Sequence, residues 1–129
     1  MNNAPGLPAA ETVMTFDHSQ LIVGQTIPVF TQTFEVAPEQ DLALYTPIML
    51  NEAKQIVKAV SGTPSIGITA FPVQTGAAET ANCAVLRAGE FDPAVIAYDA
   101  SYDTRAKRLS AFEGASSPTQ INLKTPLPA

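Results

Sequence analysis

The most reactive side chains in this sequence are one cysteine and one histidine, the residue types that form a thiolate nucleophile and its base. Cys83 lies in the apolar run 81–86, where a buried thiol acts as a small hydrophobic side chain. His18 lies far away in the sequence, in a polar stretch, and is expected on a solvated arm. A lone cysteine forms neither an intramolecular disulfide nor a cysteine-based zinc site. We therefore predict no catalytic residue and no metal site.

Paired carboxylates offer a second route to catalysis, because an acid in an apolar pocket can work beside an ionised base. The candidate acids follow the apolar run: Glu90, Asp92, Asp99, Asp103 and Glu113. Asp92 precedes a proline and is expected in a turn, Asp99 and Asp103 favour a helix start, and Glu90 is expected as a rim charge. The seven glycines are scattered singly, so no glycine-rich phosphate loop is present. We predict that the protein is not an enzyme and binds neither a cofactor nor a small-molecule substrate.

The formal net charge of −5 is unevenly distributed along the chain. Residues 1–53 contain six acids and no lysine or arginine, whereas residues 54–129 contain six acids and seven bases. Because the chain has no basic stripe, we predict no nucleic-acid binding. Two interpretations of the acidic part remain open: it keeps the protein soluble, or it docks on a basic protein surface.

Charged residues make up only 15% of the chain, which favours a protein whose surface is covered by partners. No segment approaches 18 consecutive apolar residues, and the N-terminus has no basic region followed by an apolar core. We therefore expect neither a membrane span nor a signal peptide, and a protein made in a reducing cytoplasm.

The 129 residues suffice for one domain with extended ends, and the pattern divides them into 1–27, 28–115 and 116–129. The first segment is rich in proline and small residues at its start, so we predict a flexible arm. It also contains apolar residues that would form a strand if a partner supplied a sheet edge: Val13, Met14, Phe16, Leu21, Ile22 and Val23. A simple frayed terminus is the alternative.

Alternating apolar residues predict five short strands in the central segment: one from about Ile27 to the turn at Pro38, then 42–50 with an interruption at Pro47, 54–60, 66–70 and 83–88. Turns are expected at 38–41 and 61–64, and a polar loop at 74–82. Gly67 inside a strand predicts a close backbone approach or a bulge. Many short strands at this spacing favour a compact barrel or sandwich, so the fold class is mainly β.

One segment has helical spacing, with Tyr98, Tyr102, Ala106 and Leu109 on one face. Asp99 or Ser101 can cap its first turn, and basic residues gather in its last turn. We predict one short α-helix near the C-terminus. The segment 116–129 contains three prolines and is expected to lie extended over the surface.

Four segments together carry a resemblance to a known family: 41–50 (DLALYTPIML), 66–70 (IGITA), 87–91 (RAGEF) and 97–114 (AYDASYDTRAKRLSAFEG). In this order and spacing, the chain resembles the head decoration proteins of lambda-like tailed phages. The resemblance covers residues 40–115, more loosely 28–40, and neither end of the chain. Its most telling elements are Thr-Pro-x-Met-Leu at 46–50 and Ala-Phe-x-Gly at 111–114.

The resemblance implies a β-clip or small β-barrel-like domain with a short helix. It also implies a homotrimer that binds the major capsid protein at local three-fold sites of the expanded head. Such a protein is made in the host cytoplasm and ends on the outer surface of the virion. The flexible arm of the family adds a strand to the shell protein, which here would use Met14, Phe16, Leu21, Ile22 and Val23.

Two alternatives remain open at this point. One is another virion surface or adhesion module. The other is a trimeric dUTP-hydrolysing enzyme, since fold does not determine function. Such an enzyme needs an aspartate base on a strand and a glycine-rich C-terminal tail, whereas this tail is proline-rich and lacks glycine after Gly114.

Overall fold

The computed structural model describes residues 18, 20–24 and 27–125. Met14 and Phe16, and with them most of the predicted arm, lie outside the described residues. The described residues form a mainly β domain with one short helix, as the sequence predicts. Its elements in chain order are β1 Ile22–Gly24, β2 Phe30–Val36, β3 Asp41–Leu42, β4 Pro47–Leu50, β5 Ile56–Lys58, β6 Gly67–Thr69, β7 Val73–Gln74, β8 Ala81–Phe91, α1 Arg105–Leu109 and β9 Gln120–Leu123.

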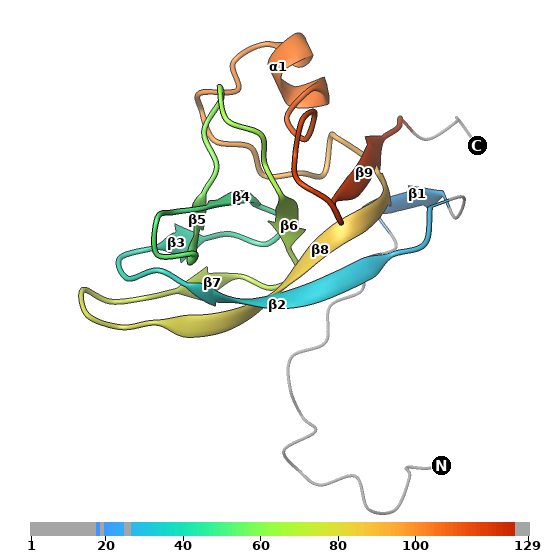
Figure 1. Ribbon diagram of the computed structural model, residues 1–129. Helices are drawn as coiled ribbons and strands as arrows, with labels where there is room; N and C mark the ends of the chain where they lie inside the picture. Colours follow the sequence, from blue (N-terminus) through green and yellow to red (C-terminus); the bar gives the residue numbers. More distant parts are fainter. Residues whose placement is uncertain (1–17, 19, 25–26, 126–129) are drawn as a thin grey trace, which may run out of the picture.

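Five strands close into a small barrel in the order β8, β2, β5, β4, β6 and back to β8. The predicted barrel-like architecture is therefore confirmed. β3 and β7 form a separate two-stranded antiparallel sheet beside it (Figure 1). Closure of the barrel removes most sheet edges, so its strands can be as short as three residues.

Strand β8 is the longest element and organises the sheet. It pairs with β2 along most of its length, from Ala81↔Val36 to Ala88↔Phe30. On its other side it pairs with β6 in its middle, and near its C-terminal end it pairs with both β1 and β9. The end of β8 therefore carries two terminal strands beyond the barrel (Figure 1).

The predicted close approach at Gly67 is confirmed. A Cβ atom there would lie 2.5 Å from Cγ1 of Val85 and 2.8 Å from the carbonyl oxygen of Leu86, both on β8. Only glycine allows β6 to pack this tightly, and this packing closes the barrel.

Two clusters of buried side chains form the core. The first lies inside the barrel and comprises Val36, Leu42, Ile48, Ile56, Ile66, Cys83 and Val85. The second extends from the barrel to the helical segment and comprises Leu21, Tyr45, Ile68, Ala70, Leu86, Phe91, Ile96, Tyr102, Ala111 and Phe112. Cys83 is buried as predicted, and burial raises the pKa of its thiol.

The prediction of one strand over 42–50 is wrong. A turn at Leu44 and Tyr45 separates β3 from β4, and Tyr45 takes a positive φ of 61°. Pro47 does not interrupt a strand but begins β4, a position where the missing amide hydrogen is tolerated.

The helix is shorter than predicted and begins later. Its N-cap is Thr104, whose side chain accepts a hydrogen bond from the Lys107 amide, rather than Asp99 or Ser101. Asp99 instead accepts from the Ser101 amide in a preceding turn. Tyr102 is buried, but Leu109 is 38% exposed, so the predicted helix face is wrong at its C-terminal end.

The C-terminal segment joins the main sheet over its described part. Residues 120–123 form β9, which pairs in parallel with the last residues of β8, from Ala88↔Gln120 to Phe91↔Leu123. The extended path predicted from its prolines is thus a strand here, and its side chains Ile121 and Leu123 pack against the second core cluster.

Candidate functional site

The junction between the leading segment and the barrel is fixed by His18. Its Nδ1 atom lies 2.6 Å from the hydroxyl oxygen of Tyr45, and the two rings meet edge to face. Its carbonyl oxygen accepts hydrogen bonds from the amides of Leu21 and Ile22. The expectation of a solvated arm histidine is therefore wrong, because the barrel itself supplies a partner for the ring.

The structure separates the five predicted partner-binding residues into two groups. Leu21 is completely buried in the core, and Ile22 pairs with Phe91 and packs against the same cluster. Val23 is half-buried on β1. These residues fill a sheet edge of their own chain, which contradicts their assignment to a free arm; Met14 and Phe16 lie outside the described residues.

The side chain of Glu90, on β8, packs against β1 and helps to hold it in place. Its side chain is 5% exposed, so the expectation of a rim charge is wrong. A Cβ atom on Gly24 would clash with Oε1 of Glu90, so the glutamate side chain packs directly against the backbone of β1. The pairing of a glycine on β1 with a large side chain on β8 makes the junction specific.

The remaining candidate acids are dispersed and serve local structure. Oδ1 of Asp92 accepts a hydrogen bond from the Ala94 amide, which confirms it as a turn residue. Hydrogen bonds from Ser101 lower the pKa of Asp99, and Lys107, 2.8 Å away, lowers the pKa of Asp103. Within residues 18, 20–24 and 27–125, no group of three or more histidine, cysteine or acidic side chains is placed to bind a metal.

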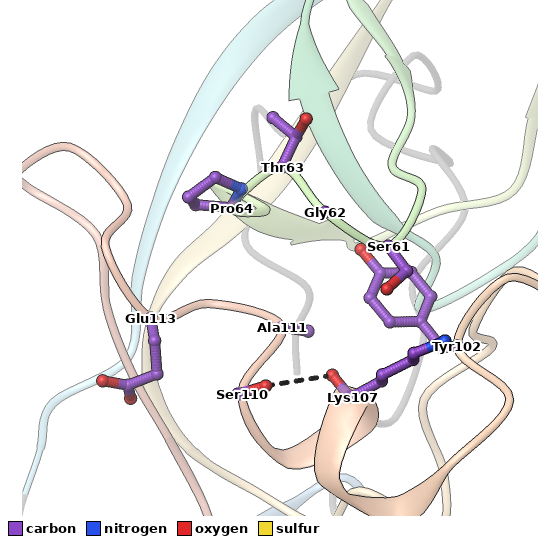
Figure 2. Close-up of a pocket in the computed structure, with 9 residues that line it drawn as sticks. All are labelled: Ser61, Gly62, Thr63, Pro64, Tyr102, Lys107, Ser110, Ala111 and Glu113. Carbon is purple, nitrogen blue, oxygen red and sulfur yellow. Dashed lines mark hydrogen bonds between the residues drawn. The ribbon is translucent and has the colours of Figure 1, made fainter.

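A small cavity of about 170 Å³ lies between the turn at 61–64 and α1 (Figure 2). Its wall includes the amine-bearing Lys107 and the hydroxyl-bearing Ser110. Lys107 is paired with Asp103, and Oγ of Ser110 donates to the carbonyl oxygen of Ala106, so neither group is poised as a nucleophile or base. The hydroxyl of Tyr102 is buried without a hydrogen-bond partner among the described residues.

An open edge of the sheet runs along β2, which Figure 1 shows at the outside of the barrel. β2 pairs with β8 throughout, but with β5 only at Val36↔Ile56. On that side, residues 30–35 have no strand partner in the described ranges. Val29 and Phe30 are 43% and 45% exposed beside this edge. Free backbone groups next to exposed apolar side chains are suited to protein binding.

A buried arginine supports this edge from inside. Arg87 donates from Nη1 to Oε1 of Gln32 on β2 and from Nη2 to Oγ1 of Thr119 just before β9, at 2.8 and 2.7 Å. Its guanidinium also lies 5.4 Å from the ring centre of Phe34. No local sequence pattern reveals such a buried cation.

No protein-family model and no curated protein matches the chain. The resemblance to phage decoration proteins rests on the residue pattern of the four segments quoted above. No helix in the described ranges has the length and apolar character needed to cross a bilayer.

Proposed function

We propose that the protein is a capsid decoration protein. It binds as a homotrimer to the major capsid protein, at local three-fold sites on the outer surface of the expanded phage head. There it stabilises the shell against the pressure of packaged DNA. The proposal combines the family resemblance of residues 40–115 with one structural observation, the anchored junction at His18.

The anchor supports an adhesive role because it joins a closed barrel to 17 preceding residues at a fixed point. Leu21 is buried and His18 is held by Tyr45, so the point at which the preceding segment joins the barrel is fixed. Since Leu21 and Ile22 are engaged in their own domain, shell contacts would come from earlier residues. Met14 and Phe16, two of the large apolar side chains in that segment, are the predicted contacts.

Three copies would make such a contact strong. Ordering about ten residues costs roughly 10–20 kcal/mol of backbone entropy, so one segment alone would bind weakly. Three segments on one rigid trimer act at high effective concentration, and their combined affinity exceeds a single contact by about 100- to 10,000-fold. Many trimers would then reinforce a shell without any catalysed reaction.

Co-sedimentation with decoration-free heads tests the proposal. The protein should bind expanded heads and leave unexpanded heads unbound. Deleting residues 1–17, which keeps the His18 anchor, should preserve the fold and the trimer but weaken binding by at least about 100-fold. Binding of the truncated protein at unchanged concentration would refute the role of the leading segment.

A matched pair of variants locates the contact. Met14→Ser with Phe16→Ser should weaken binding, whereas Asn2→Ser with Asn3→Ser in the same segment should not. Equal binding of both variants would show that apolar contacts from this segment do not hold the protein on the shell.

A further inference from the structure

Helix α1 is an exposed knob on the domain. None of its five residues is buried, and Leu109 is one of the most exposed large apolar side chains in the described ranges. Arg105, Arg108 and Leu109 line a shallow cavity of about 270 Å³. So short a helix gains little stability by itself. Arg108 is held by a hydrogen bond from its Nε to the Tyr102 carbonyl oxygen, but all five residues of the helix are exposed and can contact a partner.

A hollow of about 300 Å³ lies over the two-stranded sheet of β3 and β7. Its lining combines the apolar residues Leu42, Ala43, Pro72 and Val73 with the exposed polar side chains of Asp41 and Gln74.

Two more exposed carboxylates border this sheet. The Glu39 amide donates to the carbonyl oxygen of Gly76, and Oε1 of Glu79 accepts from the Gly76 amide. The ion pair within 4 Å joins Lys107 and Asp103, so Glu39, Asp41 and Glu79 form no ion pair with another described residue. The hollow is therefore both apolar and acidic.

The knob and the hollow carry opposite charges and lie in different parts of the domain, with α1 at the top of Figure 1 and β3 and β7 at the left. We propose that α1 of one copy docks on the β3–β7 hollow of a second copy. Arg105 then pairs with Asp41 of the neighbouring copy, and Leu109 covers the apolar lining of the hollow. This inference rests on the proposed function, because it names the subunit interface of the trimer.

The contact is head to tail, since it joins two different surfaces. When the same contact is repeated from copy to copy, the copies form a closed ring if the rotation between neighbours adds up to a full turn. The proposed trimer is such a ring with three copies. Opposite charges facing each other across the contact fix its register and disfavour other pairings.

Charge reversal on the full chain tests the interface by analytical ultracentrifugation. Arg105→Glu and Asp41→Lys should each raise the dissociation constant of the oligomer by at least about tenfold, because like charges then face each other. The double variant Arg105→Glu/Asp41→Lys restores opposite charges and should recover most of the association. Lys54→Glu, in the turn between β4 and β5 and outside both surfaces, is the matched control and should behave as wild type.

The outcomes separate this inference from the proposed function. An oligomer that resists both single substitutions, or a double variant as weak as the single ones, overturns the interface while capsid binding is still observed. A monomer that also ignores expanded heads overturns both. Unchanged thermal midpoints confirm that the variants fold.

Discussion

His18 and Tyr45 connect two segments that are 27 residues apart, with Nδ1 of the histidine 2.6 Å from the tyrosine hydroxyl oxygen. Tyr45 is itself fixed by its backbone: its amide donates to the carbonyl oxygen of Thr69, and its carbonyl oxygen accepts from the Ala97 amide. These bonds hold a positive φ that bulky residues rarely adopt. The entry point of the leading segment is thus tied to β6 and to the loop before α1.

Replacing Tyr45 with phenylalanine removes this hydrogen bond while keeping the ring. The free energy of unfolding in urea should fall by about 0.5–1.5 kcal/mol, the usual worth of one hydrogen bond. Amides of residues 21–24 should also exchange faster with deuterium than those of β4. Equal exchange in both regions would show that the tyrosine hydroxyl does not anchor the junction.

Two leucines should differ sharply in their effect on stability. Leu21→Ala removes a completely buried side chain and should cost about 2–5 kcal/mol. Leu109→Ala, on the exposed helix, should cost less than about 0.5 kcal/mol in the isolated subunit. Measuring both by chemical denaturation at a concentration below oligomer formation tests this order. A large loss of stability in Leu109→Ala together with a small loss in Leu21→Ala would show that Leu109 is the buried side chain and Leu21 the exposed one.

The sequence predicted those elements whose signal lies in a few neighbouring residues and does not depend on distant parts of the chain. The alternation over Phe30–Val36 identifies β2, the apolar run around Cys83 identifies part of β8, and Gly67 marks the close contact that closes the barrel. Each of these signals resides in a few neighbouring residues.

Features that depend on distant segments could not be predicted in this way. The apolar run at 21–23 indicates a strand, but only the fold shows that its own β8 supplies the edge. The split of 42–50 depends on the turn conformation of Tyr45, which no residue type signals. Likewise, the buried Arg87 is satisfied by Gln32 and Thr119, which lie 55 and 32 residues away.

Gly24 and Glu90 should behave as a coupled pair. Gly24→Ala adds a methyl group that clashes with the Glu90 carboxylate and should cost about 1–3 kcal/mol. Shortening the second side chain in Gly24→Ala/Glu90→Ala makes room, so the double variant should lose less than the sum of the single variants. A double-mutant cycle measures this coupling, and strict additivity would show that the two side chains do not compete for one space.

Alkaline pH should destabilise the fold. Burial raises the pKa of Tyr98 to about 12, and it also raises the pKa values of Tyr102 and Cys83. In the unfolded chain these groups lose their protons near their ordinary values of about 8.5–10, so above that range unfolding releases protons. The free energy of unfolding should therefore be fully retained below about pH 8.5 and fall from there towards pH 12. Tyr98→Phe should make this decline shallower, and an unchanged slope would mean that Tyr98 titrates alike in both states.

The Arg87 network should control β9 more than the rest of the barrel. Arg87→Met keeps the apolar stem but leaves the side-chain oxygens of Gln32 and Thr119 without this donor, which should cost roughly 2–4 kcal/mol. The Ile66 carbonyl oxygen keeps the hydrogen bond that it accepts from Oγ1 of Thr119. Arg87→Lys keeps the charge but lacks the planar fork that reaches four acceptors, so it should recover only part of this loss. Because Thr119 precedes β9, deuterium exchange at residues 120–123 should accelerate in both variants while the β4–β5 pairing stays protected. If the lysine variant matches wild type in stability and exchange, then the positive charge near Phe34, rather than the hydrogen-bond network, holds this region together.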